Sequence, residues 1–156
     1  MKTLFSYTPI GLLRTPYTTP ESIPKSMGRP PVAEGVIELD PAYEEGLLDI
    51  EGFSHLLVIV AFHLSKNKPL RVTPPGQSRE RGVFATRSPH RPNAIGVLTV
   101  ELLSREGVKL HVRGVDVVDG TPVLDIKPHI PIADVYEGAR VPPWIDVLSG
   151  KGGSRK

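Results

Sequence analysis

Short apolar stretches recur along the chain and are separated by polar segments rich in proline and glycine. Residues 35–39 (GVIEL) and 108–118 (VKLHVRGVDVV) alternate apolar and polar positions, a pattern typical of strands with one buried face. Residues 54–63 (SHLLVIVAFH) are almost continuously apolar, which predicts a strand buried on both faces. The same reasoning predicts further strands at 9–15, 82–86, 94–103 and 123–127.

The connections between these strands carry turn and loop residues. We expect the strands 94–103 and 108–118 to form a hairpin across residues 105–107. Residues 119–122 (DGTP) predict a tight turn, because Asp-Gly is a strong turn sequence. Longer polar loops are expected at 17–31 and 66–80.

A short helix is predicted over residues 41–50, where Asp40 suits the N-cap and Pro41 the first helical position. About seven short strands with so little helix favour an all-β fold, either a small antiparallel β-barrel or a sandwich. The length of 156 residues indicates one domain, which we expect over 1–150, with residues 151–156 as a disordered tail.

Composition narrows the function classes. The absence of cysteine excludes disulfides, thiolate catalysis and cysteine metal sites. No stretch resembles a signal peptide or reaches transmembrane length, so a cytoplasmic protein without membrane contact is expected. A formal net charge of +2 permits a nucleic-acid partner without requiring one.

Residues 81–96 (RGVFATRSPHRPNAIG) concentrate polar chemistry between two apolar runs. One interpretation is a solvated turn that keeps the protein soluble; the other, which we favour, is a binding loop on a rigid frame. Prolines on either side of His90 and Arg91 restrict the backbone, and the Asn93 amide can both donate and accept hydrogen bonds. Guanidinium groups suit carboxylate or phosphate ligands, and this region contains Arg71, Arg79, Arg81, Arg87 and Arg91.

Two aspartates near the end of the strand 108–118 invite different interpretations. Asp119 and Gly120 read as an ordinary turn. Asp116 is flanked by valines, so its carboxylate is expected either to pair with an arginine or to serve a ligand.

The histidines do not predict a metal site, because their spacings lack HxH and HxxxH pairs. His55 begins the apolar run and is expected to be structural, whereas His63 ends it within reach of a ligand. No glycine-rich nucleotide loop occurs, and Ser88 lacks the frame of a serine nucleophile. Trp144 is expected to pack rather than to bind.

Four blocks together resemble the TrmO family, also called YaeB or TsaA-like: residues 10–17, 54–63, 82–96 and 118–128. The resemblance covers about residues 10 to 131. It implies an S-adenosylmethionine-dependent methyltransferase acting on N6 of threonylcarbamoyl-adenosine beside the anticodon of tRNA. It also implies a small antiparallel β-barrel unlike the Rossmann methyltransferases, and a homodimer with the cofactor close to the subunit interface.

Carried over residue by residue, the resemblance implies a set of cofactor contacts. The chain departs from the family at Lys25 and Ser26, where many relatives have arginine and glutamine, and lysine lacks the bidentate fork. It also has Ala94 after Asn93 where proline is common, and His129 where tyrosine is frequent. The implied cofactor contacts are Pro24, Lys25, Ser26, His63, Leu64, Arg87, Leu98, Gly114, Val115 and Asp116.

We assign roles within this reading as hypotheses. Asp116 is the preferred general base and His90 the alternative, while Asn93 positions the adenine amine. Two rivals remain: a cofactor-binding barrel that methylates a small molecule, and a non-catalytic RNA-binding or regulatory module. The scarcity of aromatic residues argues against a stacking RNA module. Arg71, Arg79, Arg81 and Arg91 are assigned to phosphates of the anticodon stem-loop.

Overall fold

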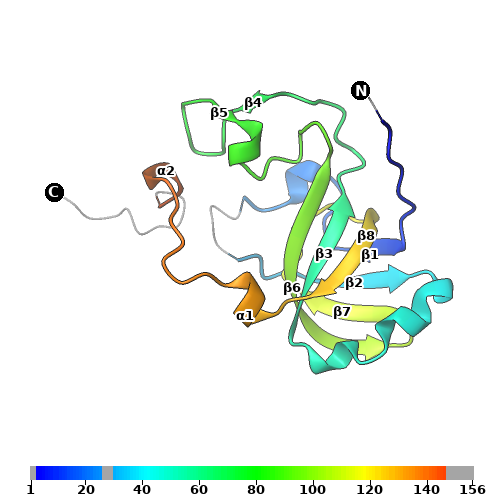
Figure 1. The fold of residues 1–156 in the computed structure, drawn as a ribbon. Helices are drawn as coiled ribbons and strands as arrows, with labels where there is room; N and C mark the ends of the chain where they lie inside the picture. Colours follow the sequence, from blue (N-terminus) through cyan, green and yellow to red (C-terminus); the bar gives the residue numbers. More distant parts are fainter. Residues whose placement is uncertain (1–2, 26–29, 147–156) are drawn as a thin grey trace.

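A closed barrel of antiparallel strands forms the centre of the molecule in a computed structural model that describes residues 3–25 and 30–146. The strand order is β1-β2-β7-β6-β3-β8, and every neighbouring pair is antiparallel (Figure 1). The predicted small antiparallel β-barrel is therefore confirmed. The barrel strands are β1 (Gly11–Arg14), β2 (Glu34–Leu39), β3 (His55–Ala61), β6 (Ile95–Glu106), β7 (Lys109–Arg113) and β8 (Thr121–Pro128).

Alternate side chains of each strand fill the barrel interior. In β3, Leu56, Val58 and Val60 are fully buried, and they pack against buried residues of the other strands. The intervening Leu57 and Ile59 point outward and are only half-buried. The prediction that residues 54–63 are buried on both faces is therefore wrong for the single chain, and an apolar outer face remains.

The predicted strand at 82–86 is also wrong. A two-residue strand β5 (Arg81–Gly82) pairs with β4 (Arg71–Val72), and a 3-10 helix (Val83–Ala85) follows at once. The Val83 side chain is buried, and its carbonyl accepts hydrogen bonds from the backbone and hydroxyl of Thr86. The apolar residues of this segment therefore reflect the burial of a tight turn and not a strand. The β4–β5 hairpin projects from the barrel (Figure 1).

The predicted strand at 108–118 ends early, at Arg113. Gly114 has a φ of 108°, a conformation that favours glycine. The N–H groups of Gly114 and Val115 both donate to the Ala33 carbonyl, at 2.8 and 3.2 Å. The chain therefore leaves the sheet here and crosses the end of the barrel.

The predicted helix at 41–50 is a 3-10 helix (Pro41–Leu47), and Asp40 caps it by accepting the Ala42 N–H at 2.9 Å. Further 3-10 turns span Pro20–Ser22 and Ile50–Gly52. Two single-turn helices, α1 (Pro131–Asp134) and α2 (Pro143–Asp146), follow β8. No helix among the described residues is long and apolar enough to cross a membrane. The predicted tail at 151–156 lies outside the described residues.

The antiparallel order places three long connections at one end of the barrel. These are the segments between β1 and β2, between β3 and β6, and between β7 and β8. Almost all candidate site residues lie on these segments, so the topology brings them together although they are far apart in sequence.

Candidate functional site

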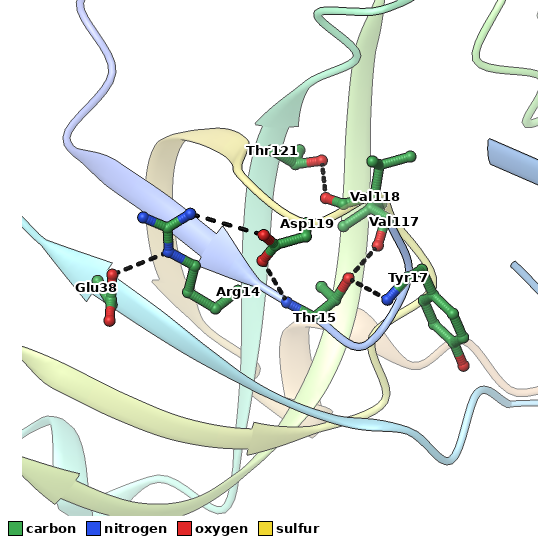
Figure 2. A network of polar contacts seen from close by, with 8 residues as sticks. All are labelled: Arg14, Thr15, Tyr17, Glu38, Val117, Val118, Asp119 and Thr121. Carbon is green, nitrogen blue, oxygen red and sulfur yellow. Dashed lines mark hydrogen bonds and ion pairs between the residues drawn. The ribbon is translucent and has the colours of Figure 1, made fainter. Parts of the chain in front are cut away.

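A network of polar contacts, called the staple below, joins the β1–β2 connection to the β7–β8 connection (Figure 2). The Thr15 hydroxyl donates to the Val117 carbonyl at 2.7 Å and accepts the Tyr17 N–H at 3.2 Å. Asp119 accepts the Thr15 N–H at 3.1 Å, and its other oxygen lies 3.7 Å from an amino group of Arg14. The N–H of Asp119 in turn donates to the Tyr17 carbonyl at 2.7 Å.

The staple fixes where the candidate cofactor loop begins. The interpretation of Asp119 and Gly120 as a turn is confirmed, and the turn also holds the segment that leads to Pro24 and Lys25. Both of these residues are exposed. Ser26, the third predicted contact in this loop, lies outside the described residues.

The connection between β3 and β6, called the middle connection below, folds back on itself. The Ser65 hydroxyl lies 2.9 Å from Nδ1 of His90, which ties the turn after β3 to the arginine-rich loop. His63 and Leu64 are exposed in that turn, and Leu64 is 50% exposed. The histidine predicted at a ligand-accessible position is therefore accessible, and His90 has a partner that fixes its ring.

The Arg91 side chain stabilises the loop that contains it. One of its amino groups donates to the carbonyls of Thr86 and Ser88, at 3.1 and 3.3 Å. These bonds hold the loop in shape, and the Asn93 side chain next to it is exposed. The rigid frame inferred from the prolines is thus reinforced by a guanidinium.

Asp116 is the half-buried carboxyl of the site. Burial raises its pKa above the ordinary value of 3.8, while a hydrogen bond from its own backbone and the positive charge of Arg87 act in the opposite direction. Of the two sequence interpretations, an ion pair or a ligand role, the first is present only as this longer-range attraction. No arginine or lysine nitrogen lies within 4.0 Å of the Asp116 carboxylate among the residues that the structure describes.

Three of the predicted cofactor contacts are buried. Leu98 is 6% exposed, and the side chain of Val115 is fully buried in the barrel core. A Cβ added to Gly114 would lie 3.3 Å from the Thr99 carbonyl oxygen. The buried side chains of Leu98 and Val115 therefore offer a ligand little surface.

The arginines of the long middle connection lack carboxylate partners. Arg14, Arg105 and Arg113 each form ion pairs elsewhere on the barrel. Within residues 3–25 and 30–146, by contrast, no carboxylate lies within 4.0 Å of the five arginines of the middle connection. Guanidiniums without a carboxylate partner can bind an anionic group. These five are Arg71, Arg79, Arg81, Arg87 and Arg91.

An open hollow of about 590 Å³ lies on the β4–β5 hairpin. Its lining is strongly basic, with a single acidic member, Glu80. The lining residues are Arg71, Ser78, Arg79, Glu80, Arg81 and Gly82. The arginines thus divide by place: these three line the hollow, Arg91 braces its loop, and Arg87 lies near enough to Asp116 to affect its charge.

Trp144 packs within the chain, and the sequence did not identify its partner. Its indole ring lies over the Arg81 guanidinium, with Cζ 4.9 Å from the ring centroid. Ser65 and Thr15 were also missed, because an isolated hydroxyl residue carries no sequence pattern that names its partner. No group of three or more histidine and acidic side chains among the described residues could hold a metal ion.

Several known proteins are similar to this chain in sequence and in fold. A family model described as the tRNA-methyltransferase O N-terminal domain matches residues 12–135. A probable S-adenosyl-L-methionine-binding protein of Pyrococcus abyssi is 44% identical over 143 residues, which are 92% of this chain and 77% of that protein. The tRNA (adenine(37)-N6)-methyltransferase of Escherichia coli is 39% identical over 140 residues, which cover 83% of this chain and 60% of that protein.

A crystal structure of TrmO from Pseudomonas aeruginosa superposes with a TM-score of 0.74 and 38% sequence identity, covering 88% of this chain and 61% of that chain. The chain thus spans less than two thirds of the Escherichia coli enzyme and of the Pseudomonas protein. The family match includes three of the four sequence blocks in full and most of the first. The chain therefore belongs to the TrmO family.

Proposed function

We propose that the chain binds S-adenosylmethionine and methylates N6 of an adenosine in tRNA, specifically the threonylcarbamoyl-adenosine beside the anticodon. One observation carries this proposal. A half-buried carboxylate, Asp116, lies at the same end of the barrel as a cluster of arginines without carboxylate partners. The names of the relatives, an S-adenosyl-L-methionine-binding protein and a tRNA (adenine(37)-N6)-methyltransferase, point the same way.

The residues present suit the cofactor. The Arg87 guanidinium offers a fork for a carboxylate, and the exposed face of Leu64 offers apolar contact. Asp116 supplies a negative charge that would attract a sulfonium. When bound, S-adenosylmethionine supplies an electrophilic methyl group.

The chain's own contribution is positioning and proton removal. The N6 nitrogen of the proposed substrate belongs to a urea-like group whose delocalised lone pair is a poor nucleophile. Asp116 would accept the N6 proton when the methyl group is transferred to that nitrogen, and burial makes its carboxylate a stronger base than an exposed aspartate. Asn93 accepts a hydrogen bond from the amine, and His90, oriented by Ser65, is the alternative base.

The proposed RNA partner is held by charge. Arg71, Arg79 and Arg81 line the open hollow, and Arg91 keeps its remaining donors for a phosphate. Phosphate contacts release counterions, so log K for RNA binding should fall steeply with log salt, by about 0.7 to 0.9 per phosphate contact. Binding that does not respond to salt between about 50 and 200 mM would contradict these contacts.

The decisive experiment follows the label from methyl-labelled cofactor into purified tRNA with and without the threonylcarbamoyl group. Labelled N6-methylated nucleoside from the modified tRNA alone supports the full proposal, and equal labelling of both tRNAs removes its substrate specificity. Calorimetry with the cofactor separates the rivals. Cofactor binding without transfer to tRNA favours a small-molecule enzyme, and absence of cofactor binding contradicts the proposal.

We further propose a homodimer. On the outer face of β6, Ile95 is 41% and Val97 57% exposed, and their partners on β3 across the sheet are Ala61 and Ile59. These four apolar residues form one strip beside the β3-to-β6 connection, which carries most of the candidate site. Such a strip is typical of a surface that a partner covers.

A further inference from the structure

The C-terminal segment returns to the basic hairpin after leaving the far end of the barrel. Strand β8 ends at Pro128, and the chain then passes through α1 to α2, which lies near β4 and β5 (Figure 1). The Gln77 side chain donates a hydrogen bond to the Trp144 carbonyl at 2.9 Å. The segment is therefore held on the hairpin by a directional contact as well as by the indole ring.

Arg81 is held in an unusual way. Its guanidinium is covered on a face by the Trp144 ring, at 4.9 Å from the centroid, and its Nε atom is buried without a hydrogen-bond partner. Within the described part of the chain, none of its side-chain donors is bonded to a protein acceptor. The cation–π contact restrains the guanidinium without a hydrogen bond to a protein acceptor, so its amino donors remain available to a ligand.

The same arginine lines the hollow together with Arg71, Ser78 and Arg79. A volume of about 590 Å³ exceeds by far the share of one water molecule, about 30 Å³, so it can admit hydrated phosphate groups. Three guanidiniums facing a single Glu80 favour an acidic ligand.

From this geometry we infer that the hollow is a binding site for backbone phosphates of an RNA and that Trp144 is its positioning residue. The indole holds the Arg81 guanidinium at the hollow, where it donates hydrogen bonds to a phosphate. This inference rests on the proposed function, because the RNA is the proposed substrate. Arg91 lies outside the hollow and belongs to the loop.

Backbone phosphates are favoured over a nucleobase or a protein carboxylate as the occupant. The hollow is open and its lining is mostly polar guanidinium, which suits a chain that passes across it. Stacking of a base would require an aromatic side chain in the lining, and none of the residues that line the hollow is aromatic.

The test uses the intrinsic fluorescence of this single tryptophan in the full chain. An RNA hairpin is titrated at several salt concentrations, and its affinity is measured in parallel by filter binding. We expect the emission to change with the same midpoint as filter binding. We expect Trp144→Ala to weaken RNA binding about 3- to 30-fold, the range of a cation–π contact, and Trp144→Phe to restore most of it.

Two further variants separate a positioning role from loss of charge or fold. Arg81→Lys keeps the charge but loses the planar fork, so it should weaken RNA binding while the salt dependence stays that of the wild type. Arg140→Ala removes an exposed charge from the same C-terminal segment and should leave both affinity and emission unchanged. Cofactor binding, measured by calorimetry, should be unaffected in all of these variants.

Several outcomes would overturn the inference. Unchanged RNA affinity in Trp144→Ala, with methyl transfer to tRNA intact, would overturn it and leave the proposed function standing. An emission change produced equally by inorganic phosphate at the same phosphate concentration would assign the hollow to a small anion instead. Failure of the wild-type chain to bind RNA or methylate tRNA would defeat both proposals together.

Discussion

The carboxyl group of Asp116 links chemistry and stability at the scale of a single residue. Asp116→Asn removes the proposed base while keeping the shape of the side chain. We expect turnover to fall by about 10²- to 10⁴-fold, the usual range for general-base catalysis, without abolishing cofactor binding. Single-turnover transfer to tRNA measures this, and full activity of the variant would reassign the base to His90.

The pH dependence of the same residue has a definite sign. Burial raises the pKa of Asp116 above 3.8, so the folded protein binds its proton more tightly than the unfolded chain. Its contribution to stability therefore falls as the pH rises from the unfolded pKa through the folded one, and the charged form is destabilising above that window. The acid limb of the activity profile should lie above the ordinary pKa of aspartate, because the ionised form is the base.

Asparagine does not ionise, so Asp116→Asn should remove the loss of stability that ionisation of Asp116 causes as the pH rises. The thermal midpoint of the variant at neutral pH should therefore equal or exceed that of the wild type. Melting curves across the acid range, compared between the two proteins, measure this effect. A neutral-pH midpoint well below the wild type would mean that the carboxylate has a stabilising partner instead.

At the scale of the element, the staple between the first and third connections positions the candidate cofactor loop. Thr15→Val keeps the shape of the side chain but removes the bond to the Val117 carbonyl and the acceptor for the Tyr17 N–H. Leaving these half-buried groups unpaired should lower the free energy of unfolding by about 1 to 3 kcal/mol and weaken cofactor binding.

Thermal melting and calorimetry with S-adenosylmethionine measure the two effects of Thr15→Val. The control is Thr18→Val, the same substitution at an exposed position of the same loop, where neither quantity should change. If both variants bind the cofactor as the wild type does, the staple serves stability alone.

The elements also show what sequence can and cannot specify. Alternation predicted β2 and β7 correctly, because their inner positions are apolar throughout, as at Ile37 and Leu110. It failed at 82–86, where Val83 is buried in a turn without a long neighbouring strand. It also overran Arg113, because the bend at Gly114 depends on a carbonyl contributed by Ala33, far away in the sequence.

The candidate site was predicted as residue types, and the topology supplied their arrangement. Asp116 and the arginines stood out because charge is unexpected between apolar strands. The division of the arginines into a neighbour of Asp116, a loop brace and the lining of a hollow follows from contacts such as that of Arg91 with Thr86, which no local pattern encodes. Trp144 was assigned to packing for the same reason, since its partner Arg81 lies far from it in the sequence.

At the scale of the whole molecule, the apolar strip on β3 and β6 is the proposed dimer interface. Val97 is 57% exposed at the centre of the strip, so Val97→Glu places a charge where the proposed interface must exclude water. Sedimentation equilibrium should show a dimer for the wild type and a monomer for this variant. Leu103→Glu is the control, because Leu103 is exposed on the same strand beyond the strip.

Activity should follow the same equilibrium if the partner copy completes the site. Methyl transfer by the wild type should then lose specific activity on dilution below the dimer dissociation constant, and Val97→Glu should be impaired at every concentration while its melting curve stays cooperative. A variant that sediments as a dimer would rule out this face as the interface. A monomeric variant with full specific activity would instead show that one barrel holds the complete site.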